Sequence, residues 1–293
     1  MKRDLYDEIA SNKRRSYALV FFFVLFVGLL GLVFTLTTSF GILGFPIAVA
    51  IAGIIAYVQY KNGDKVVLKI SKAKPVEKAD NPKLFNTVEG VAIAAGVPMP
   101  KIYTIEDSSP NAFATGRDPE HASIAVTTGL LDKLNRQELE GVIAHEMSHI
   151  RNYDIKMMTI AVALAGVVVM LSDFILRSFI WGGGRRRNSG GKGNLVMFAI
   201  AIVLAIIAPI FAMMIQLAIS RKREYLADAS GAMLTRYPEG LASALEKISK
   251  DKEPLEVANK ATAHLYIANP VNVKTLFSTH PPIEERITRL RAM

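Results

Sequence analysis

The feature that most constrains the fold is a run of 45 residues without a charged side chain, Ser16–Tyr60. As one α-helix rising about 1.5 Å per residue it would be about 67 Å long, about twice the thickness of a hydrocarbon core of about 30 Å. The turn-forming residues 37–41 divide the run, and Pro46 stands near the start of the second half, where a missing N–H is tolerated. We therefore expect residues 1–60 to form a short tail and a transmembrane hairpin.

Two further uncharged runs, Met157–Ser172 and Gly193–Ser220, predict a second membrane hairpin over residues 157–220. A basic loop, residues 182–194, connects them. Basic residues also flank the first hairpin on both sides, and the positive-inside rule then places its two ends in the cytoplasm. The basic loop opposes that rule if the second hairpin crosses completely. Two topologies stay open: cytoplasmic charges elsewhere outweigh the loop, or the hairpin packs beside the soluble part without a full crossing.

The remaining sequence, residues 61–156 and 221–293, is expected to form the two halves of one soluble α+β domain. Asn81 as a cap and Gly96 as a stop delimit a helix over Lys83–Ala95. Short β-prone runs separated by turn sequences suggest a small antiparallel sheet, and the tail is mainly helical. The predicted strands are Lys101–Ile105, Ala112–Thr115 and Ala122–Thr127, and the predicted tail helices are Pro238–Lys250 and Pro282–Ala292.

The sequence H-E-x-x-H is formed by His145, Glu146 and His149. Asn135 and Glu138 form a predicted capping box before an apolar stripe at helical spacing, so the motif is expected on a helix. Residues four apart are about 40° apart around a helix, so both imidazoles share one face and could bind one metal ion. The glutamate follows the first histidine and could act as a general base. The alternative is an amphipathic helix whose histidines only pack.

A catalytic zinc ion usually takes three protein ligands. The chain has no cysteine, which excludes thiolate sites, disulfides and a thiol nucleophile and leaves histidine and carboxylate as ligands. Glu224 and Asp228 are four residues apart on one predicted helical face. Glu224 would bind the metal, while Asp228 could accept a hydrogen bond from a ligand histidine and fix its tautomer. The alternative is a surface helix with ordinary i,i+4 charges.

Composition separates the classes of partner. The chain is 51% hydrophobic and 21% charged, with a formal net charge of +9. Its lysines and arginines gather beside apolar runs rather than interleaving with aromatic residues on one face, so a lipid bilayer explains the positive charge better than nucleic acid. We expect no nucleic-acid partner, and the sequence does not define an oligomeric state.

The order of motifs along the chain resembles the HtpX-type membrane zinc metallopeptidases, gluzincins related to the CAAX prenyl proteases. The resemblance covers essentially the whole chain. It implies a mainly α membrane protein with about four transmembrane helices and a cytoplasmic, zincin-like α+β catalytic domain, in a cell membrane. The motifs that carry it are NAFATG at 111–116, HEMSH at 145–149, SRKREYLAD at 220–228 and STHPP at 278–282.

This resemblance implies roles for individual residues. His145, His149 and Glu224 would bind one Zn²⁺ ion, with Glu146 as the base. His280 would donate a hydrogen bond to the oxyanion of the tetrahedral intermediate, or would merely cap the last helix. An edge strand would bind the substrate in extended form, or would be an ordinary turn and strand; its residues are Asn111, Ala112 and Phe113.

The expected function is that of a zinc endopeptidase that cleaves peptide or protein substrates at the cytoplasmic face. The resemblance adds a role in stress response, the degradation of misfolded membrane proteins. One alternative is a CAAX-type prenyl-protein protease, although four spans look too few to enclose a lipidated tail. Another is a non-catalytic zinc-binding membrane scaffold, in which Glu146 would have no use.

Overall fold

The computed structural model describes most of the soluble part of the chain and a portion of the first predicted hairpin. The second predicted hairpin, apart from residues 157–161 and 164, lies outside the described residues, and so does His280. The described residues are 10, 14–26, 44–161, 164, 221–251, 253–255, 265–268 and 281–293.

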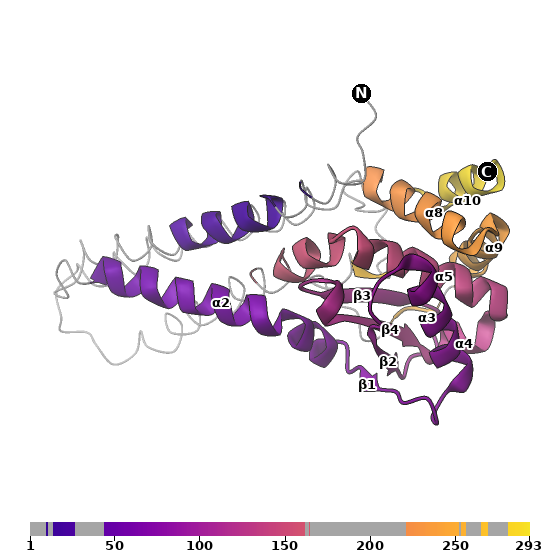
Figure 1. Ribbon diagram of the computed structural model, residues 1–293, viewed down its shortest axis with the longest axis horizontal. Coiled ribbons are helices and arrows are strands. Elements are labelled where there is room, and N and C mark those ends of the chain that lie inside the picture. Colours follow the sequence, from indigo (N-terminus) through magenta and orange to yellow (C-terminus); the bar gives the residue numbers. More distant parts are fainter. Residues whose placement is uncertain are drawn as a thin grey trace, which may run out of the picture.

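The described part is mainly helical, with one small sheet (Figure 1). The α-helices are α2 (Gly44–Ile70), α3 (Pro82–Ala95), α4 (Thr128–Lys133), α5 (Arg136–Arg151), α8 (Arg221–Thr235), α9 (Pro238–Lys250) and α10 (Ile283–Arg291), and the strands are β1 (Lys74–Pro75), β2 (Lys101–Ile105), β3 (Ala112–Gly116) and β4 (Ala122–Thr127). A short 3-10 helix, Pro119–His121, precedes β4.

Residues 14–26 are helical, and α2 extends away from the sheet and its covering helices in Figure 1. Both helices expose large apolar side chains, among them Phe21, Phe22, Ile51 and Ile54, each at least half exposed. Within the described ranges, no helix combines the length and apolar character needed to cross a membrane.

The sheet is mixed, with the strand order β1-β2-β4-β3. The prediction of a wholly antiparallel sheet was wrong, because β2 and β4 run parallel while β3 and β4 run antiparallel. The reason is topological: β3 follows β2 in sequence but lies at the edge of the sheet, and the chain then reverses so that β4 inserts beside β2. The two-residue strand β1 was not predicted because it is too short to show a hydrophobic alternation.

Helix α5 is the central element of the domain. Its capping box is present: the Asn135 side chain accepts from the Glu138 N–H at 3.0 Å, and the Glu138 carboxylate accepts from the Asn135 N–H at 2.8 Å. Lys247 of α9 also donates to this carboxylate, at 2.8 Å. The helix packs between α3, α8 and α9, and every residue from Gly141 to Ile150 is buried. This burial makes α5 the rigid base on which the H-E-x-x-H motif is held.

Gly141 lets α5 and α9 approach closely, because a Cβ atom there would lie 2.6 Å from the backbone nitrogen of Leu241. Gly141→Ala should therefore lower the free energy of unfolding by about 1–3 kcal/mol through overpacking. The matched control is Gly90→Ala on α3, where a Cβ meets nothing within 4 Å and helix propensity should raise stability by about 1 kcal/mol. Thermal unfolding in detergent, followed by circular dichroism, measures both. Equal effects of the two substitutions would contradict this account.

Candidate metal centre

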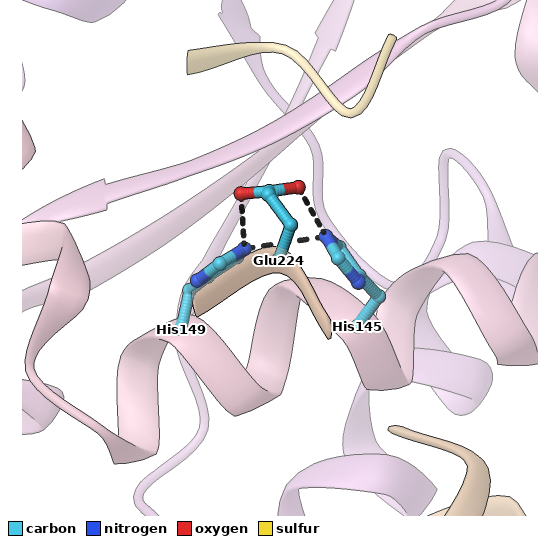
Figure 2. A group of neighbouring side chains, drawn as sticks. All are labelled: His145, His149 and Glu224. Atoms are coloured by element: carbon cyan, nitrogen blue, oxygen red, sulfur yellow. Dashed lines mark hydrogen bonds and ion pairs between the residues drawn. The ribbon is translucent and has the colours of Figure 1, made fainter. Parts of the chain in front are cut away.

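Helices α5 and α8 bring together His145, His149 and Glu224, as Figure 2 shows. One ligand atom from each residue lies within 4.8 Å of the others, and all three side chains are buried. The two imidazole Nε2 atoms are 3.2 Å apart, and the Glu224 carboxylate oxygens lie 3.7 Å from Nε2 of His145 and 3.6 Å from Nε2 of His149. Residues far apart in the sequence thus form one cluster of nitrogen and oxygen donors.

Close packing of the two helices makes this cluster possible. Gly231 of α8 faces the backbone of α5, and a Cβ atom there would lie 3.0 Å from the backbone nitrogen of His145. A larger residue at 231 would push α8 away from the histidines. The glycine therefore sets the distance between Glu224 and the two imidazoles.

Each imidazole is held from behind by a buried carboxylate. Nδ1 of His145 lies 2.9 Å from Asp228, and Nδ1 of His149 lies 2.9 Å from Asp154. A carboxylate can only accept, so each Nδ1 carries a proton, and in the neutral imidazole Nε2 is left to offer a lone pair to the centre of the cluster. Two such lone pairs 3.2 Å apart repel each other unless a proton or a cation lies between them. A cation between them and the Glu224 carboxylate would relieve that repulsion, so this donor set fits a divalent metal such as zinc.

Each of these carboxylates lies beside a buried arginine. Arg286 of α10 donates to Asp228 from Nε at 2.9 Å and from Nη2 at 2.7 Å, and Arg223 lies 3.7 Å from Asp154. Burial alone would raise the pKa of Asp228, but the Arg286 guanidinium holds it below its usual range. The Arg286 guanidinium therefore keeps Asp228 ionised and able to orient His145, and Arg223 places a second positive charge beside Asp154.

Sequence reasoning placed Asp228 behind a ligand histidine but missed Asp154 and both arginines. A signal existed for Arg286, which shares a helical face with the apolar residues Ile283 and Leu290 on α10. A charged side chain on a core-facing position needs a buried partner. No comparable pattern marks Asp154, which follows the end of α5 and turns back towards His149.

Glu146 points into the same buried region. Burial and the nearby Glu224 carboxylate raise the pKa of its carboxyl, while His149 and a hydrogen bond from the backbone N–H of Ala114 oppose the rise, and the net result is a pKa of about 7. A carboxylate with a pKa near neutrality is suited to exchange protons with a substrate. Burial also lowers the pKa of His145, whereas for His149 the carboxylates of Asp154 and Glu224 overcome burial and raise the pKa to about 9.

The residues predicted to bind substrate lie on or directly before β3. This strand forms one edge of the sheet, and its Ala114 N–H contacts Glu146, so it passes beside the cluster. Asn111, Ala112 and Phe113 are all buried. The structure therefore places this strand next to the candidate site.

Comparisons with known proteins show which family the chain belongs to. The profile of peptidase family M48 matches residues 78–293, a span that contains the whole cluster. Proteins named Protease HtpX homolog are 48% identical in Dictyoglomus thermophilum, over 98% of this chain and 94% of that protein, and 45% identical in Listeria monocytogenes, over 99% of this chain and all of that protein. The crystal structure of S. mikatae Ste24p shares 24% identity and a TM-score of 0.47, over 84% of this chain and 64% of that chain.

By its match to the family profile and to the HtpX relatives, the chain is a metallopeptidase, a hydrolase of peptide bonds. More particularly, it belongs to peptidase family M48 and, within that family, to the proteases named HtpX homologs.

The carboxylate behind His149 gives a test of metal binding. Asp154→Asn keeps the shape of the side chain but removes its charge, so affinity for Zn²⁺ should fall about 10–100-fold. Competition with a chromogenic chelator measures this on the purified protein. Asp118→Asn is the matched control, because Asp118 contacts the exposed His121 away from the cluster. Wild-type affinity in Asp154→Asn would contradict the positioning role.

Proposed function

We propose that this metallopeptidase is a membrane-anchored, zinc-dependent endopeptidase that cleaves proteins at the cytoplasmic face of a cell membrane. The observation that carries the proposal is the buried cluster of His145, His149 and Glu224 with Glu146 beside it. Its physiological role, on this proposal, is quality control of misfolded membrane proteins. That role extends to this chain the expectation drawn from its HtpX-type resemblance.

The three clustered side chains would hold the zinc ion, and Asp228 and Asp154 would keep both imidazoles in the tautomer that offers Nε2. When bound, zinc supplies Lewis acidity to the scissile carbonyl and to a water molecule. The Glu146 carboxylate takes the proton of the attacking water and passes it to the leaving amine. Its raised pKa supports this role, because the carboxyl can both accept and release a proton near neutral pH. His280 is proposed as the donor to the oxyanion.

The substrate is proposed to bind in extended form along β3, using Asn111, Ala112 and Phe113. The edge position of this strand and its contact with Glu146 support the proposal. Addition of a strand to a sheet edge takes its affinity from backbone hydrogen bonds, which every peptide can make. An enzyme that recognises the substrate backbone rather than particular side chains can bind unfolded proteins of many sequences.

Membrane anchoring is supported by the first predicted hairpin. The described parts of its helices expose aromatic and aliphatic side chains that would be costly in water. The basic residues on both sides of the hairpin favour a cytoplasmic position for the catalytic domain. The exposed apolar residues are Tyr17, Phe21, Phe22 and Leu25 before the turn and Ile51, Ile54, Tyr57 and Val58 after it.

Replacing Glu146 tests its proposed role as the general base in peptide-bond hydrolysis. Glu146→Gln should retain zinc but lower the rate of peptide cleavage by about 10²-fold or more, because the amide cannot accept the proton. Glu140→Gln, on the same helix but outside the cluster, is the matched control and should cleave at the wild-type rate. Metal content and cleavage of unfolded casein are measured on the same samples. Full turnover by Glu146→Gln would refute the mechanism, and loss of zinc would assign Glu146 to metal binding instead.

A further inference from the structure

A short segment of the chain, Leu265–Ala268, lies along the edge of β3 that faces away from β4. Among the described strands β3 has one neighbour, β4, and the register pairs Phe113 with Ala125. Backbone groups alternate in direction along a strand, so those of Ala112 and Ala114 face the other side. There the Ile267 N–H donates to the Ala112 carbonyl at 2.9 Å. The segment thus makes a backbone hydrogen bond that an added strand would make.

The segment also engages the side chain at the start of the strand. The Asn111 side chain donates from Nδ2 to the Ala268 carbonyl at 3.1 Å and accepts from the Ala268 N–H at 3.4 Å. Together with the bond at Ala112, three hydrogen bonds link the segment to the proposed substrate strand. The same amide and carbonyl groups would be needed to hold an extended peptide.

Two side chains fix the segment in place. The Tyr266 ring packs edge to face on Phe113, with 5.1 Å between the ring centres, and its hydroxyl lies 3.3 Å from that of Ser71. Arg286 donates to the Ile267 carbonyl at 3.0 Å and also to the carboxylate of Asp228, which lies against Nδ1 of His145. One buried guanidinium therefore touches both the segment and the metal centre, so a shift of Ile267 changes the surroundings of the cluster.

We propose that Leu265–Ala268 is an internal pseudosubstrate: it occupies the position of a peptide strand along β3 and must leave Ala112 before a substrate can bind there. This inference rests on the proposed function, which assigns β3 to substrate binding. The occupant that displaces the segment is an extended polypeptide, recognised through its backbone. The protease is then closed at rest, and cleavage depends on the strength of the contacts that hold the segment.

Loosening the segment should open the site. Tyr266→Phe removes only the hydroxyl that contacts Ser71, so KM for a fluorogenic decapeptide cleaved by the wild type should fall about three- to tenfold while kcat changes little. Tyr103→Phe on β2 is the matched control and should leave KM unchanged. An unchanged or higher KM in Tyr266→Phe would mean that the segment is a fixed wall of the site.

A second measurement does not depend on turnover. In Glu146→Gln loaded with zinc, saturating decapeptide should speed hydrogen–deuterium exchange at the Ile267 amide about tenfold or more, because its bond to Ala112 is lost. Unchanged or slower exchange with peptide bound would overturn the proposal. If the wild type cleaves neither this decapeptide nor casein, the proposed function itself fails. If the wild type cleaves and the Ile267 amide stays protected, only the pseudosubstrate inference fails.

Discussion

The arrangement of the domain depends on two imidazoles whose Nε2 atoms face each other in a buried space. His145 and His149 are 3.2 Å apart at Nε2, and the Glu224 carboxylate lies against both. In a region of low dielectric such a group is stable only if a cation or an added proton fills the space between its members. The tight contact of α5 with α8 at Gly231 forces the three side chains into this position. The capacity of this cluster to hold a cation therefore follows from how the two helices pack.

The charges around the cluster are ordered in layers. Asp228 and Asp154 orient the histidines, and Arg286 and Arg223 lie beside these carboxylates. Removing one partner of a buried charged pair would leave the other charge uncompensated, which is strongly destabilising. The arginines therefore hold the two aspartates in place, and the aspartates in turn keep a proton on Nδ1 of each histidine. Arg286 extends this order to the backbone of Ile267 and hence to the edge of the sheet. The candidate metal site and the segment beside β3 are therefore physically connected through Arg286.

Local signals allowed much of this structure to be predicted. The helix over Pro82–Ala95, the capping box of α5 and the three longer strands follow from residues close together in sequence, and their bounds agree with prediction within one or two residues. The parallel pairing of β2 with β4 was predicted wrongly because strand order depends on contacts between distant segments. Arg286 was missed because its partner Asp228 is distant in the sequence, whereas Asp154 was missed because no sequence pattern shows that the chain turns back towards His149 after α5.

On the proposed function, side chains of α5 and α8 share one metal ion. Anomalous diffraction at the zinc absorption edge, from crystals of the full chain grown with zinc, tests it most directly. We expect a single strong anomalous peak within bonding distance of Nε2 of His145, Nε2 of His149 and a carboxylate oxygen of Glu224. A zinc peak bound by other residues, with no anomalous density between these three side chains, would contradict it.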